Sequence, residues 1–344
     1  MEEKYLGKTG LALLWAKLKE KLALKQDALI GLEGQLVGFD ADGQPTAQDS
    51  WQSNRNLLDN WYFAAPVDQR DEYVVPPGTA YYSDTGLTAK VGTLSAYARF
   101  IAANSTYGKI TLNGTDYYTA TSAARHGYVS TAYRSTIDRW MADSGCFVRE
   151  SSGLIAKSSG ASIRQLMESK AVYAGKTLTA SVLLETTGLV TATITNFNTS
   201  NTLYFGSDKT IIAQGEYGNR FFELVLPADE HVIAAKVELG SRQTLARKDA
   251  DGSWVLNDAP PHQQQELAKC QRYLDICRVR VPANASLWIP YHQQMRTAPA
   301  LTFAYNEEGF FEFVDGTITK DGFLVRNKDT AWARWFAYLA DANV

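Results

Sequence analysis

Carboxylate side chains are the groups in this chain best suited to acid–base catalysis, yet they form no recognisable catalytic pattern. Glycoside hydrolysis needs two carboxylates on either side of the scissile bond, at a spacing that only the folded chain sets. Four acidic residues lie close together in the sequence: Glu216, Glu223, Asp229 and Glu230. A charged, solvated surface explains such a cluster more simply. We therefore expect no catalytic residue, and we keep a glycan hydrolase as an alternative.

Histidine and cysteine spacing indicates neither a metal site nor a disulfide framework. The histidines are His126, His231, His262 and His292. They lack the short spacings of metal ligands, and no Cys-x-x-Cys or His-Glu-x-x-His motif is present. Two Asp-x-Asp-Gly turns, at Asp40 and Asp249, lack the later ligands of a calcium-binding loop. We expect no metal and no cofactor. The three cysteines are Cys146, Cys270 and Cys277, which we expect to be small hydrophobic side chains without a disulfide.

Aromatic side chains with polar neighbours are the groups best suited to binding, because sugars pack on aromatic faces while polar groups bind their hydroxyls. The C-terminal region is rich in them. We expect a loop from Ala285 to Gln294, between two prolines, to form the recognition edge of the protein. The ligand-binding residues predicted there and next to it are Trp288, Tyr291, His292 and Arg296.

An amphipathic helix is expected from Tyr5 to Leu32, on the N-terminal side of the β-rich domains. Its apolar residues follow alternating steps of four and three, which is the heptad pattern of a coiled coil. The residues predicted to mediate oligomerisation are Leu11, Trp15, Leu18, Leu22 and Leu29. A helix that only caps its own domain is the alternative. Residues 1–53 are thus predicted to be a helix and linker for attachment or oligomerisation.

A mainly β fold is predicted for the rest of the chain. Short runs rich in Tyr, Thr and Val alternate with turn residues, and Asn113-Gly114 predicts a tight hairpin. Many short strands with turns between them predict a β-sandwich or jelly roll at 54–258. Residues 259–344 are expected to form a helix from His262 to Arg278 and then a small β-rich domain.

Composition excludes several classes of protein. Of the 344 residues, 45% are hydrophobic, which is enough for packed cores, and the net charge of −3 argues against a general affinity for nucleic acid. No apolar run approaches the length of a membrane-spanning helix, and residues 1–4 lack the features of a signal peptide. We expect a protein made in the cytoplasm, without membrane insertion.

Several segments together resemble one family of proteins. They are Asn56-Leu-Leu-Asp-Asn-Trp-Tyr-Phe, Pro66-Val-Asp-Gln-Arg, Thr136-Ile-Asp-Arg-Trp, Lys236-Val-Glu-Leu-Gly-Ser-Arg-Gln-Thr-Leu-Ala and Glu266-Leu-Ala-Lys-Cys-Gln-Arg-Tyr. In this order they resemble the tail-fibre or receptor-binding proteins of phages and prophages of gut Firmicutes. The resemblance implies a central jelly-roll β-sandwich at 54–258, similar to carbohydrate-binding modules, in which residues 71–135 are an insertion. It implies a homotrimer in the virion tail, joined to other tail or baseplate proteins through N-terminal residues 1–53. It also implies a host-recognition head that binds a bacterial surface carbohydrate.

The motif residues also have a structural interpretation. We expect Ile137–Trp140 to be a strand, with Asp138 and Arg139 forming ion pairs with Arg70 or Asp68. The function that fits best is attachment to a bacterial surface glycan. The alternatives are a baseplate or fibre adaptor without a ligand, and a tail-spike glycan hydrolase.

Overall fold

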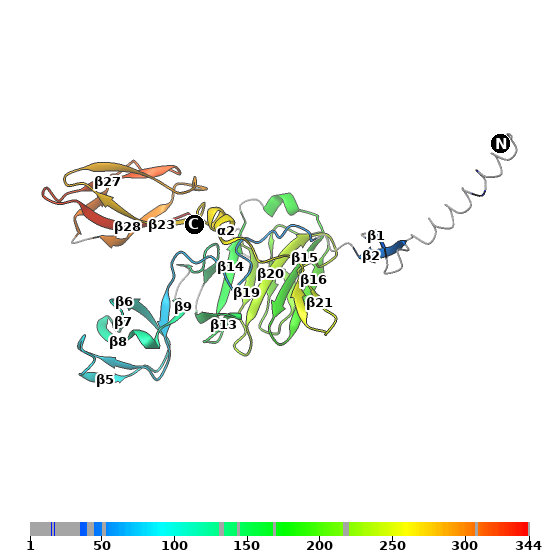
Figure 1. Cartoon of the computed structure of the whole chain (residues 1–344), viewed down its shortest axis with the longest axis horizontal. Helices are drawn as coiled ribbons and strands as arrows, with labels where there is room; N and C mark the ends of the chain where they lie inside the picture. The colour runs from blue at the N-terminus through cyan, green and yellow to red at the C-terminus, as the bar shows by residue number, and fades with distance from the viewer. Residues whose placement is uncertain are drawn as a thin grey trace, which may run out of the picture. The chain divides into compact units, whose positions relative to one another are not determined.

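The computed structural model describes residues 15, 17, 35–39, 45–49, 53–130, 134–142, 145–167, 170–215, 220–306 and 309–342. The chain divides into two compact units, Met1–Ser53 and Asn54–Val344, and each is described by itself (Figure 1). The first unit contains an antiparallel hairpin of β1 (Gln35–Phe39) and β2 (Pro45–Asp49). Trp15 is helical and exposed. The other residues expected to mediate oligomerisation, Leu11, Leu18, Leu22 and Leu29, lie outside the described residues.

The second unit is mainly β, as predicted, and its centre is a sandwich of two sheets. The six-stranded sheet has the order β10 (Arg134–Ser135), β11 (Met141–Ala142), β14 (Ser162–Leu166), β19 (Arg220–Val225), β17 (Asn201–Phe205) and β18 (Ile211–Gly215). Opposite it lie the first six strands of a twelve-stranded sheet: β16 (Gly188–Ile194), β15 (Leu178–Leu184), β20 (Val232–Leu239), β13 (Gly153–Ala156), β12 (Gly145–Glu150) and β9 (Arg125–Ser130). Side chains of both sheets share one core, which includes Trp140, Phe147, Val182, Phe205 and Phe222.

One pairing departs from the jelly roll that we expected. β17 and β19 run parallel, whereas the other described strand pairs of the sandwich are antiparallel. A jelly roll is built from antiparallel strands. The sandwich is therefore present, and its six-stranded sheet has a mixed strand direction.

The segment between Asp71 and Ser135 extends the sandwich by adding strands to the edge of one sheet. They are β3 (Tyr73–Val75), β6 (Ala98–Ala102), β7 (Tyr107–Leu112), β8 (Thr115–Ala120), β4 (Ala80–Tyr82) and β5 (Lys90–Thr93). The predicted hairpin is confirmed: β7 and β8 pair around Asn113 and Gly114, whose φ angles are 50° and 80°. Positive φ at both positions defines the turn type that Asn-Gly favours. This segment has its own small core around Val75, Phe100 and Ile110.

The C-terminal residues form a second, smaller sandwich after a short helix. Helix α2 (Gln263–Cys270) is followed by the sheet β23 (Leu274–Val281), β28 (Arg334–Asp341) and β25 (Ala300–Asn306), and by the sheet β24 (Ser286–Pro290), β27 (Gly322–Asn327) and β26 (Phe311–Phe313). Both sheets contribute to one core that contains Phe323, Phe336 and Tyr338.

Two predictions for this region are wrong. The helix expected to reach Arg278 ends at Cys270, because residues 274–281 alternate and pair along their whole length with β28. Cys277 therefore lies in a strand and not on the helix with Cys270. Part of the loop expected at Ala285–Gln294 is strand β24, which pairs with β27.

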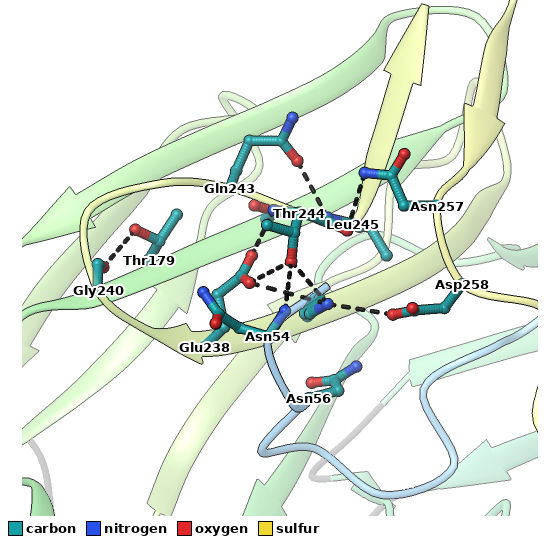
Figure 2. Close-up of polar contacts among 12 residues, drawn as sticks. Asn54, Asn56, Thr179, Glu238, Gly240, Gln243, Thr244, Leu245, Asn257 and Asp258 are labelled. Carbon is teal, nitrogen blue, oxygen red and sulfur yellow. Dashed lines mark hydrogen bonds and ion pairs between the residues drawn. The ribbon is translucent and has the colours of Figure 1, made fainter. Parts of the chain in front are cut away.

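A buried polar network explains the motif that begins at Lys236. The Lys236 side chain is 1% exposed, and its Nζ lies 2.9 Å from Thr244 Oγ1 and 3.2 Å from Asp258 Oδ2. Glu238, with no exposed surface, accepts a hydrogen bond of 2.6 Å from the backbone N–H of Thr244. Figure 2 shows Glu238, Thr244 and Asp258 converging on one centre beside Asn54. The network joins β20 to the hairpin of β21 (Ala246–Lys248) and β22 (Trp254–Leu256).

Candidate functional site

Asn60 is the centre of a junction at which four of the motifs meet, its own among them. Its Nδ2 donates to the carbonyls of Val67, at 2.8 Å, and Asp138, at 2.7 Å, and its Oδ1 accepts from Val67 N–H at 2.8 Å. Trp140 Nε1 donates to the Asn60 carbonyl at 3.0 Å. The backbone N–H of Asn60 donates to Glu266 at the start of the last motif. These motifs therefore have a shared structural role, which is to fix their loops against one another.

Residues 137–140 form a turn between β10 and β11, not the strand that we predicted. Arg139 has a φ of 71°, in the left-handed region, which a strand does not contain. The predicted ion pairs are also wrong. Asp138 accepts from Gln69 N–H and Gln69 Nε2 at 3.0 and 2.6 Å, and Arg139 Nε lies 3.0 Å from Asp59. The two side chains of the turn therefore contact different loops: Asp138 contacts the loop of Gln69, and Arg139 contacts the loop of Asp59.

Burial of Asp138 perturbs its titration. The side chain is buried, and burial raises the pKa of its carboxyl to about 7, while the hydrogen bonds from Gln69 favour ionisation and lower it. Burial also raises the pKa of neighbouring Asp68, whose carboxylate interacts with Tyr128 and Arg149. The junction therefore contains a carboxyl that gains a proton near neutral pH.

The free energy of unfolding is expected to fall as pH rises from about 4 to about 7. In that range folded Asp138 retains a proton that the unfolded chain has released, because its folded pKa lies above the unfolded value of about 3.9. The full rise of the pKa on folding corresponds to a loss of at most about 4 kcal/mol in the free energy of unfolding. Urea denaturation at several pH values would measure the slope. Asp138→Asn removes the titrating group and is expected to flatten it; an identical slope in the variant would contradict this assignment.

A basic cavity of about 360 Å³ opens beside this junction. Its lining comes from three motif segments and from the turn that follows β14, which includes the 3₁₀ helix η2 (Lys170–Tyr173). The lining residues that carry charge or an aromatic ring are Arg55, Asp59, Arg139, Tyr173, Lys269, Arg272 and Tyr273. Four of these are cations, and Asp59 is the only carboxylate among the described lining residues.

The cations differ in how they are held. Arg139 is buried and rigid: it binds Asp59, donates to the Leu166 carbonyl at 3.1 Å, and its guanidinium lies 3.4 Å from the centre of the Tyr273 ring. Arg55, Lys269 and Arg272 are exposed. Lys269 lies 2.9 Å from the buried carboxylate of Glu266. The cavity therefore has a fixed, neutralised floor and an excess of positive charge at its rim.

Such a cavity suits an anionic ligand with an apolar face. Arginine and lysine donate charge-assisted hydrogen bonds to carboxylates and phosphates. Val172 is exposed, Tyr173 is partly exposed, and together with Met167 they supply apolar surface on one wall. A sugar that carries an acidic group presents both kinds of surface.

The structure does not bring the four predicted ligand-binding residues into one site. Trp288 is exposed and lies over Gly322, while Tyr291 is buried in the C-terminal core. His292 is held by Asp275, whose Oδ1 lies 2.7 Å from its Nδ1. Arg296 lies with its guanidinium 5.9 Å from the centre of the Tyr273 ring, next to the basic cavity. Of the four, Arg296 is therefore the residue nearest the cavity.

The sequence alone did not single out Arg55, Lys269 and Arg272 as candidate binding residues. Each lies in or beside a motif that carries the family resemblance, but Arg55 is about two hundred positions away from Lys269 and Arg272 in the chain. The one sequence feature that could have indicated them is that basic residues lie in or next to several of the motifs. Only the folded junction shows that these segments share one cavity.

No protein-family model, curated protein or solved structure matches this chain. Among the described residues, no helix is long and apolar enough to cross a membrane. In the same part of the chain, no group of three or more His, Cys, Asp or Glu side chains is arranged to hold a metal ion.

Proposed function

We propose that this protein is a receptor-binding protein of a phage tail, and that it attaches to an acidic glycan on a bacterial surface. The basic cavity beside the Asn60 junction is the observation that carries the glycan assignment. The phage assignment rests on the resemblance of the motif segments. The mainly β architecture is compatible with both.

The rim of the cavity would make first contact with the ligand. Arg55, Lys269 and Arg272 are exposed, so they can attract an acidic polymer before it docks. Arg139 and Tyr273, which are buried, would keep the cavity open in one shape. Tyr173 and Val172 would pack against the apolar face of a sugar ring.

Removal of the rim charges is the test of this site. The triple variant Arg55→Gln, Lys269→Gln, Arg272→Gln is expected to attach to cells at least about tenfold more weakly, because charged hydrogen bonds each contribute about 1.5–3 kcal/mol. Attachment of labelled protein to a panel of Firmicutes isolates would be measured. The matched control is Arg326→Gln, Lys328→Gln, which removes exposed cations of the C-terminal domain.

Three outcomes would contradict the proposal. Undiminished attachment of the triple variant would place the ligand elsewhere. No attachment of the unmodified protein to any isolate would favour an adaptor within the tail, without a ligand. Release of new reducing ends from a bound polysaccharide would instead indicate a glycan hydrolase.

The oligomeric part of the proposal concerns residues 1–53. We expect a homotrimer assembled through the N-terminal heptad residues, with this segment also joining other tail or baseplate proteins. The solution mass of the full chain, compared with that of a chain lacking residues 1–53, tests whether the trimer depends on this segment.

A further inference from the structure

A second cavity, of about 470 Å³, has a different chemical character. It lies against one end of the six-stranded sheet and is lined by residues of β14, β17 and β19 and by three adjoining loops. Its polar lining residues include Ser159, Ser162, Tyr204, Ser207, Glu223 and Asp229. The described lining contains two carboxylates and no basic side chain, in contrast to the basic cavity.

Strand pairing aligns two of the lining residues, Tyr204 and Glu223, with their neighbour Ile212 across the sheet. Tyr204 is paired with Glu223 on one side and with Ile212 on the other. Their chain neighbours Leu203, Phe205 and Leu224 point into the core, so Tyr204, Glu223 and Ile212 belong to the outward face. Ile212 is exposed, and Tyr204 is partly exposed. The row therefore presents an aromatic ring between an apolar side chain and a carboxylate.

The carboxylates of the cavity are positioned by cations outside its lining. Arg220 Nη1 lies 3.3 Å from Glu223 Oε2, and Lys209 Nζ lies 3.0 Å from Asp229 Oδ2. Each contact engages one carboxylate oxygen, which leaves acceptor capacity on the carboxylate. These oxygens can accept hydrogen bonds from hydroxyl groups of a ligand.

Several hydroxyls of the cavity remain available for a ligand. In the described part of the chain, the hydroxyls of Ser159, Ser162, Ser207 and Tyr204 make no hydrogen bond to another residue. Each can both donate and accept. The cavity thus combines adaptable hydroxyls, oriented carboxylates and one aromatic face, which is the combination that recognises a sugar ring.

We propose that this cavity is a second saccharide subsite, selective for uncharged sugar units. Its described lining offers no cation to bind an acidic sugar, while its two carboxylates accept hydrogen bonds from the hydroxyls of neutral ones and the Tyr204 ring packs on the sugar. The inference rests on the proposed function of the protein in glycan attachment, and it adds a ligand class that the basic cavity does not favour. A heteropolymer with acidic and neutral units could occupy both cavities.

Titration of the full chain with neutral disaccharides tests the subsite. The probes are maltose, cellobiose, lactose and mannobiose. Binding of each is measured by calorimetry or by NMR. We expect at least one to bind with affinity that is insensitive to salt, since no net charge is neutralised. Tyr204→Ala is expected to weaken that binding by about tenfold or more, while Tyr204→Phe retains the ring and most of the affinity. Tyr82→Ala, a partly buried strand tyrosine of the insertion, is the matched control.

The two cavities can be separated in this experiment. Binding of a neutral disaccharide by the triple variant of the basic rim, at unchanged affinity, would support an independent subsite even if that rim binds no acidic glycan. Glu223→Gln provides a second probe that keeps the side-chain volume, and it is expected to weaken binding several-fold by removing a charged acceptor. Absence of binding by all four disaccharides, or equal binding by Tyr204→Ala and the parent, would overturn the proposal.

Discussion

Replacement of Trp140 by alanine is expected to lower the free energy of unfolding by about 3–5 kcal/mol. The Trp140 side chain has no exposed surface and lies between the two sheets. Its ring meets Phe63 and Phe222 edge-on, at centroid distances of 5.2 and 6.4 Å. The truncation would leave a cavity that these rings cannot fill, and it would also remove the hydrogen bond from Nε1 to the Asn60 carbonyl.

Chemical denaturation measures this loss directly. The matched control is Trp332→Ala, because Trp332 is 69% exposed and its removal is expected to change stability by no more than about 0.5 kcal/mol. Equal effects of the two substitutions would show that Trp140 does not occupy the core position described here.

Replacement of Lys236 by methionine is the second substitution with a large expected effect, of about 3–5 kcal/mol. Methionine retains much of the apolar stem but removes the ammonium that faces Asp258 and Thr244. Glu238, with its Oε2 3.8 Å from Lys236 Nζ, would be left without this cation in a fully buried position. An uncompensated buried charge costs far more than a lost surface ion pair.

A double variant separates charge from packing in this network. Lys236→Met combined with Glu238→Gln removes both buried charges and is expected to be more stable than Lys236→Met alone, as read from denaturation midpoints. Lys328→Met, which alters an exposed lysine near Glu312, is the control and should have little effect. If the double variant were the less stable of the two, the loss would come from the hydrogen bonds that Glu238 accepts from Thr244.

Local sequence signals predicted those parts of the fold that depend on neighbouring residues. Asn113-Gly114 defines its hairpin because both residues tolerate positive φ. The composition of short, turn-bounded runs likewise predicted a mainly β chain. The end of helix α2 was missed because the pattern of Leu267, Cys270, Leu274 and Cys277 fits a helix, whereas pairing with β28 makes the last two part of a strand.

Long-range contacts determined what the sequence could not predict. Residues 137–140 have the composition of a strand, yet hydrogen bonds from Asn60 and Gln69 hold them in a turn. The basic cavity also depends on long-range contacts, since Arg139 and Arg272 come from separate motifs and Arg55 directly precedes a third. Aromatic content predicted ligand-binding residues in the C-terminal domain, but there Tyr291 is buried in the core and His292 contacts Asp275.

The central claim is that the basic cavity binds an acidic glycan, and the affinity of the full chain for a purified surface polysaccharide tests it most directly. The polysaccharide would come from an isolate to which the protein attaches, and it would be titrated untreated, after chemical reduction of its carboxyl groups, and after removal of its phosphate. We predict that one of the two treatments weakens binding at least about tenfold, and that salt weakens binding to the untreated polymer. Equal affinity for all three polymers, independent of salt, would contradict the claim.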